Sequence, residues 1–192
     1  MHLMTILAAI LTGAFLGIAL TALVARDGVV FDQRSIGPWT MAARTGSESI
    51  DPYARARLLV SGELPIANGE GFSLVAVRDS DGNVLDGRCI YRLSGLFPVA
   101  RYWTLTLTRP DGTLTTNSLD RVGFTSAEII RYQGTGFSIE IGATPLAGNW
   151  LPSPPAGPFQ LILRLYETPL SATATVLETR MLPSLAREGC RP

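Results

Sequence analysis

The stretch GNWLPSPPAGPFQLILRLYETP, from Gly148 to Pro169, decides the fold. Its second half, Phe159–Tyr166, alternates with a period of two, which is the side-chain period of a β-strand. Three leucines at alternate positions share one face, while Arg164 and Tyr166 lie on the other. The prolines before the strand fix φ and lack N–H donors, which keeps them out of a sheet. We therefore interpret the stretch as a corner that leads a strand into a core, with Trp150 closing one end of the fold.

The same period of two recurs along the chain after residue 71, between turns rich in Asp and Gly. The clearest local signal is a hairpin over 101–117, because Asp111-Gly112 is flanked by Thr-rich alternation. Short helical turns are expected over 125–128, from its capping-box spacing, and over 183–189. Several short strands with hydrophobic faces predict a mainly antiparallel β-sandwich of two sheets. The predicted strands are 72–77, 87–95, 101–108, 113–117, 137–143, 159–166 and 174–182.

A helix is predicted ahead of the strands, in DPYARARLLVSGELP over 51–65. Asp51 suits the N-cap, Pro52 the first helical position and Gly62 the end of the helix. One face of this helix is apolar, and we expect it to pack in the core with the two arginines pointing outward. That face consists of Tyr53, Ala56, Leu59 and Val60.

The first apolar segment, Ile6–Val24, carries no charge. As a helix it would span roughly 29 Å, about the thickness of the hydrocarbon core of a bilayer. The best candidate cleavage site, after Ala25, places Leu23 at a position where signal peptidases need a small residue. Residues 1–25 therefore predict an uncleaved transmembrane signal-anchor helix.

The rest of the chain is expected to form a connector over 26–50 and a sandwich domain over 51–192. Trp39 in the connector fits either the membrane interface or the edge of the domain. Three arginines follow the apolar segment and none precedes it, which on charge alone weakly favours a cytoplasmic domain.

The two cysteines, Cys89 and Cys190, give a second indication of the compartment. Such a pair readily forms a disulfide in an exported bacterial domain. It would close a loop of about 100 residues and stabilise the fold by up to ~4.7 kcal/mol. The alternative is two unrelated thiols, one buried and one in a loose tail.

The composition excludes several classes of function. Sixteen acidic and sixteen basic residues leave no net charge to attract nucleic acid. The single histidine is His2, so histidine-based metal sites, triads and general bases are excluded from the domain. No nucleotide-binding glycine motif is present, and no cofactor or metal is predicted. The sequence thus favours a protein that is not an enzyme.

The remaining candidates for chemistry are few. Glu140 and Glu167 could face each other as a catalytic carboxylate pair, although Glu140 could equally form an ion pair with Arg164. The turn over 79–86 has three aspartates like an oxygen-ligand loop for calcium, but it lacks a following Glu, which favours a plain hairpin turn. Several aromatic residues could form a carbohydrate-stacking platform or be core residues: Tyr91, Tyr102, Trp103 and Trp150.

Four segments in this order resemble a bacterial family known as domain of unknown function 1214: ARYWTLTLTRPDGTL, the stretch from Arg121 to Ser126, QGTGFSIEIG, and GNWLPSPPAGPFQLILRLYETP. The similarity covers about 72–182, and the helix and apolar segment ahead of it resemble short membrane-anchored members. The resemblance implies a jelly-roll-like sandwich outside the cytoplasm and, in larger relatives, a second domain. It implies no activity and no catalytic residue.

These observations together predict a single-pass inner-membrane protein with a periplasmic β-sandwich that acts as a binding or envelope-interaction module. The alternatives are a carboxylate-dependent enzyme that processes carbohydrate or lipid, and a subunit of a complex with a larger two-domain relative. The expected partners are the membrane, a carbohydrate or lipid ligand, and such a protein. The residues proposed for a ligand face are Glu140, Trp150, Arg164 and Tyr166.

Overall fold

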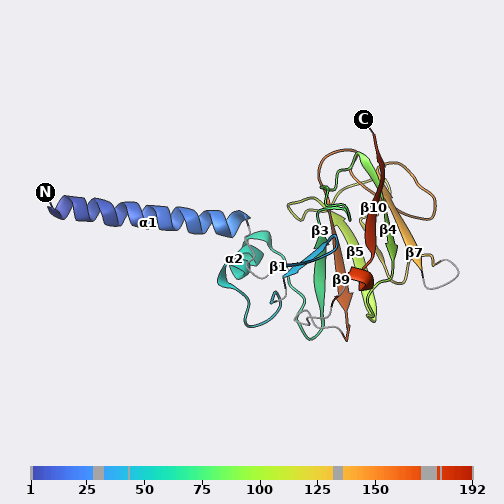
Figure 1. Ribbon diagram of the computed structural model, residues 1–192, viewed down its shortest axis with the longest axis horizontal. Coiled ribbons are helices and arrows are strands. Elements are labelled where there is room, and N and C mark those ends of the chain that lie inside the picture. Colours follow the sequence, from blue (N-terminus) through green and yellow to red (C-terminus); the bar gives the residue numbers. More distant parts are fainter. Residues whose placement is uncertain are drawn as a thin grey trace.

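The structure is a computed structural model that describes residues 2–27, 33–42, 44–131, 136–169, 177 and 179–191. Two β-sheets pack face to face, and a long N-terminal helix extends away from them (Figure 1). The predicted mainly β sandwich with few helices is therefore confirmed. The jelly-roll connectivity stays a prediction.

The larger sheet has six strands in the order β1-β2-β3-β9-β5-β6, all of them antiparallel. β9, the strand with the alternating leucines, lies near its centre between β3 and β5. The strands are β1 Gln33–Ile36, β2 Trp39–Ala42, β3 Gly71–Ala76, β5 Tyr102–Thr108, β6 Gly123–Thr125 and β9 Gln160–Tyr166.

The smaller sheet has four strands in the order β10-β4-β7-β8. β4 pairs with β10 and β7 in antiparallel fashion, whereas β8 runs parallel to β7. This parallel pair departs from the predicted antiparallel order because the chain over 143–148 loops back before it enters β8. The strands are β4 Cys89–Gly95, β7 Phe137–Gly142, β8 Asn149–Pro152 and β10 Ser184–Cys190.

The core lies between the sheets and follows the predicted alternation. The three alternate leucines of β9 are completely buried, as are Ile139 and Ile141 of β7. Aromatic rings fill one part of this core, where Phe97 stacks between Trp103 and Phe137 with centroid distances of 3.8 and 4.2 Å. Each fully buried leucine or isoleucine contributes about 1.5–3 kcal/mol relative to an exposed position, so the core fixes which strand faces point outward.

Strands β1 and β2 lie in the range expected to be a connector, and they extend the six-stranded sheet beyond β3. Trp39 of β2 is completely buried, and its Nε1 donates a hydrogen bond to the Pro183 carbonyl oxygen at 2.8 Å. Two positions were predicted for Trp39, the membrane interface and the edge of the domain. The structure places Trp39 in the domain.

The C-terminal predictions are partly wrong. Of the segment over 183–189, expected to be a helical turn, residues 184–189 belong to β10, because they pair with β4 apart from a bulge between Arg187 and Gly189. Such non-local pairing overrides the local helix preference of Leu, Ala, Arg and Glu. The described part of the strand expected over 174–182 contains a short 3₁₀ helix, Thr179–Met181; residues 174–176 and 178 lie outside the described residues. The strand expected over 113–117 is reduced to one bridge at Leu114.

Two helices precede most of the sandwich: α1, His2–Asp27, and α2, Pro52–Ser61. The predicted caps of α2 are confirmed, since Asp51 accepts hydrogen bonds from two backbone N–H groups at the helix start and Gly62 adopts a left-handed φ of 68°. The predicted packing face is wrong: Ala54 is the buried residue of this helix, while Leu59 and Val60 are 80% and 74% exposed.

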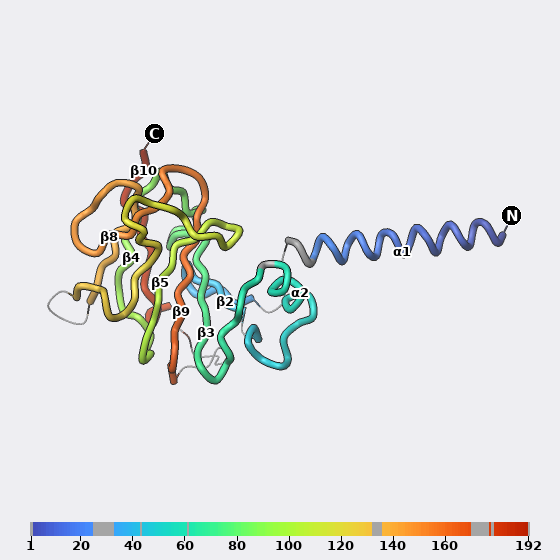
Figure 2. Tube along the Cα trace, turned by 180° about the vertical axis from the view of Figure 1, so that it is seen from behind, coloured from blue at the N-terminus to red at the C-terminus, as the bar shows by residue number. Residues whose placement is uncertain are grey.

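Helix α1 is long and apolar enough to cross a membrane, and none of its apolar part is buried inside the protein. In both views it projects from the end of the sandwich where α2 lies (Figures 1 and 2). An apolar helix whose membrane-length part is not buried inside the protein suggests a membrane anchor.

Candidate ligand-binding face

The four residues predicted to form a ligand face divide between the outer faces of the two sheets. Glu140 and Trp150 are neighbours on the four-stranded sheet, where they are register partners on β7 and β8. Arg164 and Tyr166 lie on β9 of the six-stranded sheet. Because the core separates these faces, the four residues do not form one site.

On the four-stranded sheet, Glu140 and Trp150 have structural partners. Glu140 accepts hydrogen bonds from the Arg92 Nε and the Ser138 hydroxyl, both at 2.8 Å. The hydrogen bond to Glu140 raises the pKa of the Arg92 guanidinium above its usual range. The Trp150 Nε1 donates to the Gly142 carbonyl oxygen at 2.8 Å and secures the edge strand. The predicted ion pair of Glu140 with Arg164 is wrong, because the pleat and sheet order place Arg92 beside Glu140 instead.

The candidate carboxylate pair is also wrong. Glu140 belongs to the four-stranded sheet, whereas Glu167 follows the last residue of β9 and forms an ion pair with Arg101 at 2.7 Å. Each carboxylate therefore forms an ion pair with its own arginine, and the two carboxylates do not face each other. A glycosidase needs two carboxylates that flank the same glycosidic bond.

On the six-stranded sheet, Arg164 occupies the centre of the outer face. Its register partners are Ser73 of β3 on one side and Thr104 of β5 on the other. The Arg164 side chain is half-buried, yet its guanidinium forms no hydrogen bond or ion pair with any described residue. Five N–H donors of a permanently charged group are thus available to a ligand at this position.

Two tyrosines lie beside this arginine at the end of the same face. Tyr166 follows two positions after Arg164 on β9, and Tyr102 is its register partner on β5. Their ring centroids are 6.2 Å apart with an angle of 43° between the planes. Tyr102 is 39% exposed, so part of this aromatic surface is open to solvent.

The outer face is hollowed on both sides of Arg164. Ser73 lines a groove of about 560 Å³ between β1–β3 and α2, and Thr104 lines a second hollow of about 570 Å³ against the segment that leads into β6. Arg164 is the register partner of both residues, so it lies between one lining residue of each hollow, although it lines neither hollow itself. Further residues of the first groove include Thr40, Arg57, Arg78 and Gln160; those of the second include Thr106, Arg121 and Glu128.

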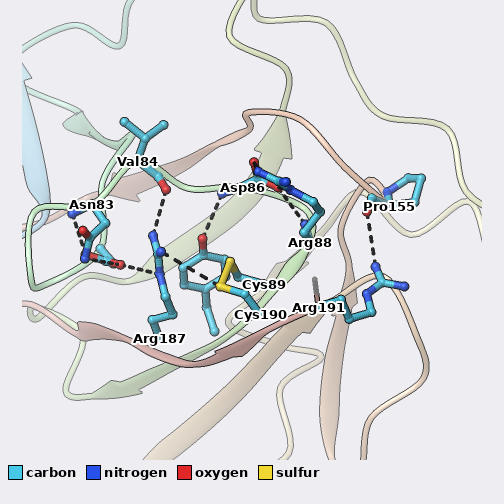
Figure 3. Close-up of a disulfide and its surroundings, with 11 residues drawn as sticks. Asn83, Val84, Asp86, Arg88, Cys89, Pro155, Arg187, Cys190 and Arg191 are labelled. Atoms are coloured by element: carbon cyan, nitrogen blue, oxygen red, sulfur yellow. Dashed lines mark hydrogen bonds and ion pairs between the residues drawn. A yellow bond between two sulfur atoms is a disulfide. The ribbon is translucent and has the colours of Figure 1, made fainter.

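The predicted disulfide between Cys89 and Cys190 is confirmed, and it joins register partners at the ends of β4 and β10. Figure 3 shows it next to Arg187, which forms an ion pair with Asp79 and donates to the Val84 carbonyl oxygen at 2.9 Å. The Nε of Arg187 lies 2.9 Å from the Asp79 carboxylate but is not aligned for a hydrogen bond, so this contact is electrostatic. These contacts hold β10, the C-terminal strand, in place on the domain.

The aspartates that resemble a calcium loop hold a turn, which is the interpretation that the sequence favoured. Asp79 has a completely buried carboxylate that accepts hydrogen bonds from the backbone N–H groups of Asp81 and Asn83. Asp86 pairs with Arg88, whose hydrogen bond lowers the pKa of the Asp86 carboxyl. Within the described ranges, no three acidic, histidine or cysteine side chains converge as metal ligands.

Of the four aromatic residues considered for stacking, Tyr91 and Trp103 belong to the core and Trp150 is held at the sheet edge. Burial raises the pKa of the Tyr91 hydroxyl, which accepts a hydrogen bond from the Asp86 backbone N–H. Of these four residues, only Tyr102 is exposed. Sequence reasoning did not find Ser73 and Thr104, because their place beside Arg164 depends on strand pairing that the alternation alone does not reveal.

The fold and its faces define a class: a disulfide-linked β-sandwich of two sheets with an N-terminal apolar helix and an open polar face on its larger sheet. The chain belongs to the family described as "Protein of unknown function (DUF1214)", whose profile matches residues 70–170. The matched range runs from β3 to the end of β9 and includes Arg164 and Tyr166. No curated protein matches the chain.

Two solved structures are similar. The VPA0106 protein from Vibrio parahaemolyticus has a TM-score of 0.60 and 19% identity, over 91% of this chain and 43% of that protein. An uncharacterized protein from Burkholderia cenocepacia has a TM-score of 0.43 and 22% identity, over 64% of this chain and 31% of that one. The first likeness shows the fold alone. This chain spans less than half the length of either protein.

Proposed function

We propose that this protein is a membrane-anchored binding module whose β-sandwich lies in the periplasm and binds an acidic saccharide across the outer face of its six-stranded sheet. The observation that carries the proposal is Arg164, a half-buried guanidinium without a partner among the described residues, at the centre of an open face. Half-buried charges are usually paired, since desolvation of an unpaired charge costs free energy. A ligand anion would supply the missing partner.

The neighbours of Arg164 indicate the class of ligand. A guanidinium matches the geometry of a carboxylate or phosphate group with two parallel hydrogen bonds. Ser73 and Thr104 offer hydroxyl groups on either side, suited to the hydroxyl groups of a sugar. Tyr102 and Tyr166 offer an aromatic surface next to them. Grooves on both sides of the arginine favour an extended ligand over a compact one.

The test is calorimetric titration of the full chain, in detergent micelles, with a galacturonic acid tetramer and with a neutral galactose tetramer as probes. We expect the acidic probe to bind and the neutral probe to bind far more weakly. Arg164→Gln should weaken binding of the acidic probe by about 10- to 100-fold, since a hydrogen bond to a charged group contributes about 1.5–3 kcal/mol.

Arg109→Gln is the matched control, because Arg109 is an exposed arginine on the turn after β5 and lies in neither hollow. This change should leave the affinity unaltered. Equal effects of the two variants, or equal affinity for the two probes, would contradict the assigned site. Inorganic phosphate as a third probe distinguishes recognition of the anion alone from recognition of the sugar.

The compartment is proposed from two supporting features. A disulfide between β4 and β10 favours an oxidising compartment, and an exposed apolar helix favours an uncleaved signal anchor in the inner membrane. A reporter enzyme that is active only outside the cytoplasm, fused after the C-terminus, should be active. Activity of a cytoplasm-only reporter at the same position would contradict the orientation.

The enzymatic alternative has no observation in its favour, because the candidate carboxylates lie on different sheets and form ion pairs. The interaction with a larger two-domain relative stays a prediction.

A further inference from the structure

Helix α2 has an apolar stripe that the sandwich does not cover. Tyr53, Leu59 and Val60 are 38%, 80% and 74% exposed, and Leu64 just beyond the helix is 89% exposed. Tyr53, Leu59 and Val60 lie on one side of the helix, and Leu64 follows in the segment after its C-cap, Gly62. The opposite side of the helix faces the domain, where Ala54 and Leu58 line the groove beside β2 and β3.

The position of this stripe indicates what covers it. α2 contacts α1, and both views place it at the end of the sandwich from which α1 projects (Figures 1 and 2). A chain anchored by α1 therefore holds α2 close to the plane where α1 leaves the bilayer. Exposed leucine and valine side chains at this position would lie next to lipid, so lipid is a nearer partner for them than a soluble protein.

The polar residues of α2 fit the same location. Arg55 lies four positions before Leu59 and so flanks the stripe, and the helix contains no acidic residue. Basic residues beside an apolar stripe are typical of helices that lie in the interface of an anionic membrane. Tyr53 also belongs to a residue type that is enriched at the headgroup level.

We propose that α2 lies on the membrane surface, with Leu59, Val60 and Leu64 inserted at the boundary between headgroups and acyl chains beside α1. The proposal rests on the membrane anchor of the proposed function, but not on its ligand. It gives the domain a second attachment point, so that the sandwich is held in one orientation on the bilayer instead of rotating freely on a single helix.

The experiment uses the full chain in vesicles that contain anionic lipid, with one environment-sensitive fluorophore per molecule. Both cysteines are in the disulfide, so a cysteine introduced by Leu59→Cys can be labelled alone under non-reducing conditions. We expect blue-shifted emission and strong quenching by lipids with a nitroxide at a shallow acyl position. Quenching by a deep nitroxide should be weaker, since interfacial helices insert about 5–10 Å. Val60→Cys repeats the measurement at the neighbouring position.

Two control positions make the outcomes distinct. Leu119→Cys labels an exposed leucine ahead of β6, on the opposite edge of the sheet, and its label should stay in water. Leu16→Cys labels α1, and its label should be quenched most by the deep nitroxide.

A label at Leu59 in water with a label at Leu16 in lipid would overturn the role of α2 and leave the anchor intact. Both labels in water would overturn the anchor, and with it this inference. Formation of a disulfide between two copies of the Leu59→Cys protein, without quenching by lipid, would show that a second copy covers the stripe and would also overturn the proposal.

Discussion

At the scale of single residues, Asn149 connects three segments through one buried amide. Its Oδ1 accepts from the Ile130 N–H at 2.8 Å, and its Nδ2 donates to the carbonyl oxygens of Ile130 and Ser138 at 2.8 and 2.9 Å. Asn149 is 3% exposed, so water cannot replace these partners. It thereby ties β8 to β7 and to the turn that follows β6.

Asn149→Ala should lower the free energy of unfolding by about 2–4 kcal/mol, because it leaves several buried backbone groups without partners. Asn117→Ala is the matched control: Asn117 also makes three side-chain hydrogen bonds to backbone groups, but in a solvent-exposed loop. The control should cost at most about 1 kcal/mol in urea unfolding. Equal losses in the two variants would contradict the role assigned to burial.

The disulfide gives a second prediction at this scale. Replacing both Cys89 and Cys190 by alanine should lower the free energy of unfolding by up to ~4.7 kcal/mol, since the bond closes a loop with a sequence separation of 101. Urea unfolding with and without a reductant measures the effect. The reductant should destabilise the natural protein and leave the double variant unchanged; a natural protein indifferent to reductant would contradict the prediction.

The Asp86–Arg88 pair predicts a dependence on pH. Hydrogen bonds from Arg88 lower the pKa of the folded Asp86 carboxyl below its ordinary value of 3.8. The stabilisation is therefore complete above that value and is lost as the pH falls through the folded pKa. Asp86→Asn should be less stable than the natural protein at about pH 7, with a smaller difference at about pH 3. Urea unfolding measures the difference in stability between the two proteins. If this difference stays constant or grows as the pH falls, the predicted direction of the pH dependence is wrong.

At the scale of elements, the contact of β3 with β9 depends on the close approach of two backbones. Gly71 has a φ of 154°, and a Cβ at this position would lie 1.9 Å from the Leu165 carbonyl oxygen. Gly69, two residues earlier, has no heavy atom within 4 Å of the corresponding point. The two glycines are therefore a matched pair for testing the packing of the central strands.

Gly71→Ala should destabilise the protein by at least about 2 kcal/mol, because either β3 or β9 must shift to relieve the clash. Gly69→Ala should change the stability by less than about 1 kcal/mol. Thermal unfolding of both variants measures the difference. If Gly71→Ala is tolerated as well as Gly69→Ala, the pairing of β3 with β9 is not as close as the structure has it.

The elements also show what the sequence could predict. β3, β4, β5, β7 and β9 were predicted because an alternating pattern with one buried face is a local signal. β1, β2, β6, β8 and β10 were not, because they are short or edge strands whose formation depends on pairing with other segments; β8 includes Pro152, which was expected to stay out of the sheet. Helix α2 was predicted with correct caps, since capping is local, but the face it buries depends on where the helix is docked.

The candidate site was likewise predictable where the signal is local and not where it depends on tertiary pairing. Arg164 and Tyr166 were found from alternation within β9. Their separation from Glu140 and Trp150 could not be predicted, because the assignment of a strand to one of two sheets is set by tertiary pairing. The hydroxyl groups beside Arg164 were missed for that reason.

At the scale of the whole molecule, the two sheets present different surfaces. The outer face of the four-stranded sheet is neutralised by its own ion pairs, among them Arg92 with Glu140 and with Glu188. The outer face of the six-stranded sheet carries Arg164, whose guanidinium pairs with no described residue, between residues that line two hollows. The chain has no net charge, so attraction of an acidic ligand must come from this local site rather than from the overall field.

The most direct test of this asymmetry is a methyl NMR titration of the full chain with the galacturonic acid tetramer. Ile162 lies on the outer face of the six-stranded sheet next to Arg164, and Ile90 lies on the outer face of the four-stranded sheet. We predict that the Ile162 methyl resonances shift as the acidic probe is added while those of Ile90 stay in place, and that Arg164→Gln abolishes the shift. Movement of Ile90 alone, or an unchanged Ile162 at saturating probe, would contradict ligand binding on this face.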